Sequence, residues 1–66
     1  MSVAKVIEIS AESAKSFEDA IKSGIATASK SVHGICGAWV NGQQAIVDKG
    51  KVTKYRVDLK VSFVLD

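Results

Sequence analysis

Side chains of alternating character run along the C-terminal quarter of the chain, from Lys51 to Asp66. One set is mostly apolar and consists of Thr53, Tyr55, Val57, Leu59, Val61, Phe63 and Leu65, and the intervening set consists of Lys54, Arg56, Asp58, Lys60 and Ser62. Because successive side chains of a β-strand point to opposite faces, the pattern predicts a long strand with one buried face.

The segment before this strand is predicted to be its antiparallel partner. Asp48-Lys49-Gly50-Lys51 has the composition of a hairpin turn, so residues 35–47 should pair with the C-terminal strand. Asn41-Gly42 is a second possible turn. We favour one long strand with a bulge at Asn41-Gly42, because a turn there would leave half of the C-terminal strand without a partner.

The N-terminal half combines a strand pattern with a helix pattern. Residues 3–10 are rich in β-branched residues and predict a first strand. Apolar residues then recur at spacings of three and four, which predicts a helix over residues 16–33: Phe17, Ala20, Ile21, Gly24, Ile25, Ala28 and Val32. Ser16 and Asp19 match a capping box, Ser13 is the alternative cap, and Gly34 is expected to end the helix in a left-handed conformation.

The predicted order is β-α-β-β, which gives an α+β fold with a three-stranded antiparallel sheet and one helix packed on one face. Residues 1–66 are expected to form a single domain. One helix leaves the other face of the sheet uncovered. In the second strand, Cys36, Ala38 and Val40 are predicted to face the helix, and Gly37, Trp39 and Asn41 are predicted to face outward beside Arg56 and its row.

Composition limits how such a short chain can be stabilised. A core built from 66 residues is marginal by itself, and small domains usually gain a disulfide, a metal or self-association. With one cysteine and one histidine, neither an intrachain disulfide nor a Cys/His zinc site is expected. Self-association is therefore expected, and a hydrophobic content of 47% is compatible with it.

Charge and hydropathy argue against several classes of partner. The formal net charge is +2 and the basic residues are dispersed, so no nucleic-acid partner is expected. The chain contains no apolar run near 18 residues, so no membrane span is expected. The N-terminus enters a strand pattern directly, without a signal-peptide core, which favours the cytoplasm, where a free thiol is stable.

Residues that could carry catalysis or bind metal are few, and no enzyme activity is expected. His33 is predicted at the helix end, where it would interact with the helix dipole. Cys36 is interpreted as a small buried hydrophobe, because no basic partner is identifiable near it. The carboxylates are scattered along the chain, so no metal site is expected.

Trp39 on a polar outward face is the most informative residue, and it has two interpretations. In one, Trp39 fills a subunit interface, and the charged row of Lys54, Arg56, Asp58 and Lys60 forms ion pairs between subunits. In the other, Trp39 offers a flat surface to a planar aromatic ligand, and Arg56 contacts a carbonyl or a phosphate. The two are compatible if the ligand lies between subunits.

The chain resembles the dodecins, which are small flavin-binding proteins with the same β-α-β-β order. The matching stretches are Lys5-Val-Ile-Glu-Ile9, Ser16-Phe-Glu-Asp-Ala-Ile21, Asp48-Lys-Gly-Lys-Val52 and Tyr55-Arg-Val-Asp-Leu-Lys-Val-Ser-Phe63. The resemblance implies a hollow homododecamer that binds flavins between subunits. It also implies a non-catalytic role, the storage of riboflavin, lumichrome or FMN.

The flavin-binding motif of the family is altered in this sequence. Flavin-binding dodecins typically carry a stacking tryptophan at the position of Gly37 and a glutamine at the position of Arg56. Trp39 is displaced from the family position by two residues, which keeps it on the same face but moves it roughly 6–7 Å along the strand. The resemblance therefore assigns flavin binding to Trp39, Arg56 and Gly37. A shell protein that binds no flavin, or that binds calcium or coenzyme A as some relatives do, is the alternative.

Overall fold

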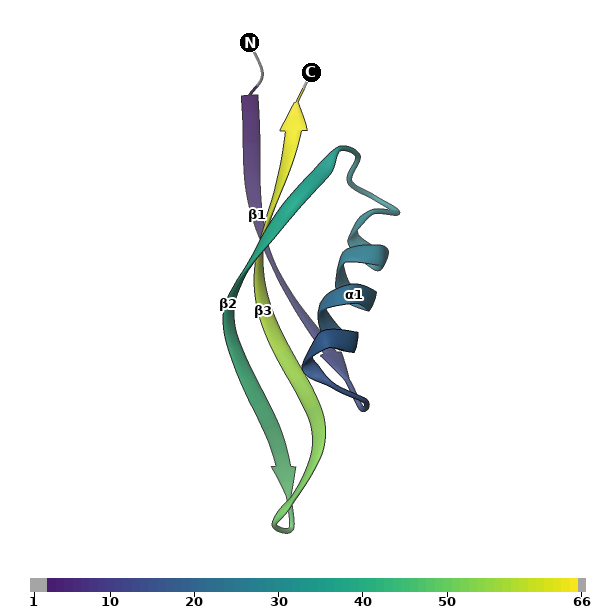
Figure 1. The fold of residues 1–66 in the computed structure, drawn as a ribbon, viewed down its shortest axis with the longest axis vertical. Helices are drawn as coiled ribbons and strands as arrows, with labels where there is room; N and C mark the ends of the chain where they lie inside the picture. The colour runs from purple at the N-terminus through teal and green to yellow at the C-terminus, as the bar shows by residue number, and fades with distance from the viewer. Residues whose placement is uncertain (1–2, 66) are drawn as a thin grey trace.

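The chain folds into one antiparallel sheet with one helix on one of its faces (Figure 1). The computed structural model describes residues 3–65. Its elements are β1 (Val3–Ser13), α1 (Phe17–Ala28), β2 (Ile35–Asp48) and β3 (Lys51–Leu65). The last strand was predicted to end at Asp66, which lies outside the described residues. The sheet order is β1-β3-β2, with both neighbours antiparallel to β3. The predicted fold class is confirmed.

The core lies between α1 and the central strand β3. The predicted alternation in β3 is confirmed, because Val57, Leu59 and Val61 are buried on the helix side and Asp58 between them is exposed. Ala20 is the buried helix residue of this cluster. The partly buried residues packed around it are Ile7, Ile9, Ala11, Phe17, Ile21, Ile25 and Ile35. The apolar stripe of the helix therefore fixes which face of the sheet becomes the core.

The β2–β3 hairpin has the turn and the bulge that the sequence indicates. Lys49 and Gly50 connect the strands, and both have positive φ, at 53° and 77°. Positive φ at both central residues is the conformation of a tight hairpin turn, which glycine adopts readily. The register shifts between Val40 and Gly42, so Asn41 is the extra residue of a bulge and β2 continues as one strand.

The helix begins where the capping pattern places it. The backbone N–H of Asp19 donates to Ser16 Oγ at 2.9 Å, so Ser16 is the N-cap. Ser13 is not the cap: its hydroxyl accepts from the backbone N–H of Lys15 and donates to Asp19 Oδ2 at 2.6 Å. These contacts hold the short connection between β1 and α1.

Two predicted boundaries are wrong. The helix ends at Ala28 instead of residue 33, and the polar segment after it forms tight turns, with the N–H of Ser31 donating to the carbonyl of Ala28. His33 therefore lies beyond the helix end, and Gly34 has the expected positive φ (78°) but leads into β2 instead of capping the helix. The first strand continues to Ser13 instead of residue 10, because the long β3 supplies pairing partners for residues 11–13.

The interpretation of Cys36 is also wrong. The register shifts between Ile35 and Gly37, so Cys36 is the extra residue of a second bulge and does not take part in the alternation. Its side chain is exposed, and Sγ lies 3.6 Å from the backbone oxygen of Ser62, a residue of the outward row. Ile35, opposite Phe63, takes the helix-side position instead.

The helix packs on β1 and β3, while the β2–β3 hairpin projects beyond it and gives the molecule a long axis of 51 Å (Figure 1). Exposed large hydrophobic residues occur at both ends and along β2: Val3, Val6, Trp39, Val40, Val47, Val52 and Leu65.

In the part of the chain that the structure describes, no helix is long and apolar enough to cross a membrane.

Candidate functional site

The sheet face opposite α1, here called the open face, carries rows of side chains that run across all three strands. Residues paired directly across strands share a face of the sheet. The register gives four rows, Val6–Ser62–Gly37, Glu8–Lys60–Trp39, Ser10–Asp58–Gly42 and Glu12–Arg56–Gln44. Gly37 and Trp39 thus lie on the open face, as the alternation predicted.

Trp39 is the exposed aromatic residue of this face. The residue is 61% exposed, and its neighbour on β3 is Lys60. Lys60 Nζ in turn lies 3.9 Å from Glu8 Oε1 on β1. The indole therefore stands on an edge strand of the sheet, where it is exposed to a planar molecule, and its neighbour Lys60 is paired with Glu8 on the other side of β3.

Arg56 does not lie beside Trp39, in contrast to the expectation from the sequence. It is four residues from Lys60 along β3, which separates the two rows by roughly 13 Å. Its guanidinium is held by Glu12, with Nε donating to Oε2 at 2.9 Å and Nη2 contacting the same oxygen. Lys54 Nζ lies 3.8 Å from the other oxygen of Glu12. Two cations thus share one carboxylate, and the cluster keeps a formal charge of +1.

Gly37 leaves an opening two positions from Trp39. It is opposite Ser62, whose hydroxyl donates to the Gly37 carbonyl at 3.3 Å. A Cβ at Gly37 would lie 3.3 Å from that hydroxyl oxygen, so even an alanine would contact Ser62 closely. The glycine and its serine partner therefore leave the β2 and β3 positions of this row without a large side chain, and Val6 occupies the β1 position.

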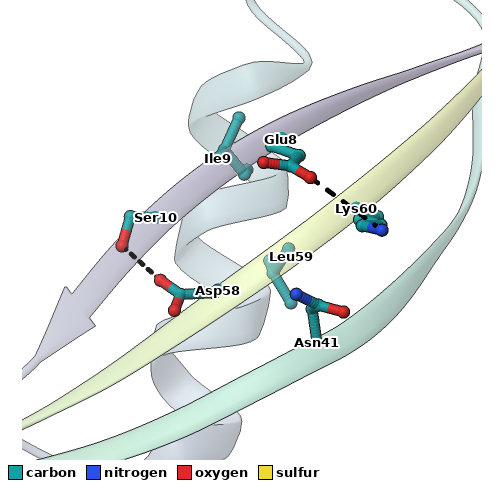
Figure 2. Close-up of a pocket in the computed structure, with 7 residues that line it drawn as sticks. All are labelled: Glu8, Ile9, Ser10, Asn41, Asp58, Leu59 and Lys60. Carbon is teal, nitrogen blue, oxygen red and sulfur yellow. Dashed lines mark hydrogen bonds and ion pairs between the residues drawn. The ribbon is translucent and has the colours of Figure 1, made fainter.

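A shallow pocket of about 280 Å³ lies on the open face, and Lys60, the β3 neighbour of Trp39, is one of its lining residues (Figure 2). Its lining residues are Glu8, Ile9, Ser10, Asn41, Asp58, Leu59 and Lys60. The side chains of Ile9 and Leu59 point to the core, so these two residues contribute the floor, and the polar residues form the walls. Ser10 Oγ donates to Asp58 Oδ1 at 2.8 Å across one wall.

Sequence reasoning did not identify this pocket. The outward positions of Asp58 and Lys60 follow from the alternation in β3, but the pocket also needs the register of β1 and the bulge at Asn41. The Asn41-Gly42 signal was present in the sequence and pointed to an irregularity of the strand. It did not show which groups would lie next to it.

Across residues 3–65, no group of three or more His, Cys, Asp or Glu side chains is arranged to hold a metal ion.

The fold and the open face define a class of small β-α-β-β proteins with a three-stranded antiparallel sheet, one helix and an exposed tryptophan on the uncovered face. A family model described as Dodecin matches residues 3–66. The chain belongs to the Dodecin family. A comparison with curated proteins gave no match.

Solved dodecin structures superpose on nearly the whole chain. The dodecin from Streptomyces davaonensis is 28% identical, with a TM-score of 0.94 over 98% of this chain and 96% of that one. A substitution variant of the T. thermophilus dodecin is 27% identical, with a TM-score of 0.93 over 100% and 98% of the two chains. The Streptomyces coelicolor dodecin, at 22% identity and a TM-score of 0.93 over 98% and 93% of the two chains, is similar in fold.

Proposed function

We propose that this chain is a non-enzymatic flavin-binding and storage protein of the cytoplasm, which forms a hollow homododecamer with ligand sites between subunits. Its ligand is riboflavin, lumichrome or FMN. The observation that carries the proposal is Trp39, which is 61% exposed and stands on a sheet face that no helix of residues 3–65 covers, next to a polar pocket. Membership of the Dodecin family supports the same assignment.

Self-association is supported by the distribution of hydrophobic residues. In the described chain, the fully buried core consists of Ala20, Val57, Leu59 and Val61, whereas seven large hydrophobic residues are exposed. Such a small core stabilises a chain of this size only marginally. Contacts with further copies would bury exposed residues of β2 such as Val40 and would protect the free edges of the sheet. Residues 1–66 would act in this assembly as one dodecin-like domain.

In the proposed site, Trp39 stacks on the flavin ring, and Gly37 leaves room for the ring beside it. Arg56 contacts a polar edge or a phosphate, and its distance from Trp39 suits the far end of a ligand better than the ring. The cluster of Arg56, Lys54 and Glu12 keeps a charge of +1, which would attract the phosphate of FMN.

The alternative is a dodecin-fold shell protein that binds no flavin, or that binds another ligand such as calcium or coenzyme A. One observation favours it. The Arg56 guanidinium is already bound by Glu12, so it serves as a link between β1 and β3 without any ligand. In this alternative, Trp39 contributes to assembly alone.

Titration of riboflavin and FMN with the protein tests the proposal. We expect flavin fluorescence and the emission of the single tryptophan to be quenched together, since stacking places the two rings in contact. Trp39→Ala should abolish the quenching, and Trp39→Phe should retain part of it. Val47→Ala, which shortens another exposed side chain of β2, is the matched control and should bind as the wild type does.

Light scattering on the same variants separates the two candidates. Under the flavin proposal, Trp39→Ala loses the ligand and keeps the oligomer. A shift of Trp39→Ala toward monomer, with no quenching by the wild-type protein at micromolar concentrations, would refute flavin binding and support the shell alternative.

A further inference from the structure

The bulge in β2 sets Asn41 apart from the other residues of that strand. Asn41 is the extra residue between the pairs Val40–Leu59 and Gly42–Asp58, so it has no partner in the ladder. Figure 2 shows Asn41 on β2 at one side of the pocket, which Leu59 and Lys60 of β3 also line. Within residues 3–65, this carboxamide makes no hydrogen bond. Its donor and its acceptor are therefore available to a bound molecule.

The other polar side chains of the pocket already form a hydrogen bond or an ion pair with each other. Ser10 donates to Asp58, and Glu8 lies opposite Lys60 at 3.9 Å. Together Glu8, Asp58 and Lys60 give the pocket a formal charge of −1. An anion is therefore poorly matched to this pocket, and a neutral group that combines donors and acceptors is well matched.

The position of the pocket relative to Trp39 fixes how a stacked ring would meet it. Side chains of a strand stand roughly perpendicular to the sheet, so a ring stacked on the indole also stands upright and turns one edge toward the sheet. Asn41 follows Trp39 by two residues, at most about 6–7 Å along the strand. That edge therefore lies within reach of the carboxamide.

We propose that Asn41 is a ligand-contacting, specificity-determining residue that pairs with the polar edge of a flavin ring stacked on Trp39. This inference rests on the proposed flavin binding. The pyrimidine edge of the ring presents a carbonyl, an N–H and a second carbonyl in sequence. A carboxamide can donate to one of those carbonyls and accept from the N–H at the same time, which a lysine or a carboxylate cannot do.

Arg56 is not suited to this contact. It lies roughly 13 Å from the Trp39 row along β3 and has donors but no acceptor. Its guanidinium is also held by Glu12. The recognition of the ring edge and the contact with a distant phosphate are thus divided between two residues of the open face.

Binding of riboflavin and of N3-methylated riboflavin to the wild type, Asn41→Leu and Asn41→Asp tests the inference. The methyl group removes the ring N–H, and Asn41→Leu removes the donor and the acceptor at similar volume. We expect the wild type to bind the methylated flavin about tenfold more weakly than riboflavin, as the loss of one well-placed hydrogen bond implies. In Asn41→Leu this ratio should fall to near one. Asn41→Asp, which keeps the acceptor and loses the donor, should retain the discrimination and bind both flavins more weakly.

Gln43→Glu is the matched control, because Gln43 pairs with Val57 and lies on the opposite face of the sheet. It should bind both flavins as the wild type does. The ratio of the two dissociation constants is measured within each variant, so a change in the folded or assembled fraction cancels. Binding of riboflavin by the wild type with an unchanged ratio in Asn41→Leu would overturn the role of Asn41. Absence of binding by the wild type would instead refute the proposed function itself.

Discussion

Replacing Gly24 with alanine should destabilise the protein, although alanine is the better helix former. Gly24 lies in α1 where the helix crosses β1, and a Cβ at this position would lie 2.7 Å from Ala11 Cβ and 3.9 Å from Leu59 Cδ1. Ala11 Cβ is fixed to the backbone of β1, so the helix and the strand would have to separate. Alanine gains about 1 kcal/mol of helix propensity, and overpacking of this kind costs about 1–3 kcal/mol. Because the contact is rigid on both sides, we expect the upper part of that range and a net loss of about 1–2 kcal/mol.

A double-mutant cycle with Ala11→Gly isolates this contact. Urea unfolding of the wild type, the two single variants and the double variant should be followed at one protein concentration, since self-association shifts apparent stability. Without the Ala11 methyl group, Gly24→Ala should become stabilising, by up to about 1 kcal/mol from helix propensity. The sign of its effect thus reverses between the two backgrounds. An equal shift of the free energy of unfolding in both backgrounds would show that the Ala11 contact does not limit the approach of the helix.

The remaining predictions concern the helix start and the core. Ser16→Ala should lower the free energy of unfolding by about 1 kcal/mol, because the N–H of Asp19 loses its acceptor. Ser16→Asp should keep most of the wild-type stability, because a carboxylate can also accept this hydrogen bond. Thermal unfolding of the wild type and the two variants tests both expectations. Leu59→Ala should cost about 2–5 kcal/mol, because Leu59 is 1% exposed under α1. Leu65→Ala, at a 49% exposed site of the same strand, is its control, and equal losses for the two would contradict the position of the core.

Much of the candidate site could be predicted because it depends on local periodicity. The alternation of β3 and the neighbouring turn placed Trp39, Gly37 and Arg56 on one face of the sheet, and the register confirms this. The pairing across that face could not be predicted, because it depends on where each strand begins and on its bulges. Lys60, not Arg56, is therefore the neighbour of Trp39.

The amino-acid sequence by itself determined the type and order of the elements and the face that becomes the core. The reason is that the spacing of apolar residues, two in a strand and three to four in a helix, is visible within a few consecutive residues. Tertiary structure decided the remaining features. The long β3 extended β1 to Ser13, the bulges exposed Cys36 and freed Asn41 from the ladder, and tight turns ended the helix at Ala28. Each of these depends on the pairing of distant segments or on the closing of a turn, and side-chain periodicity carries no information on either.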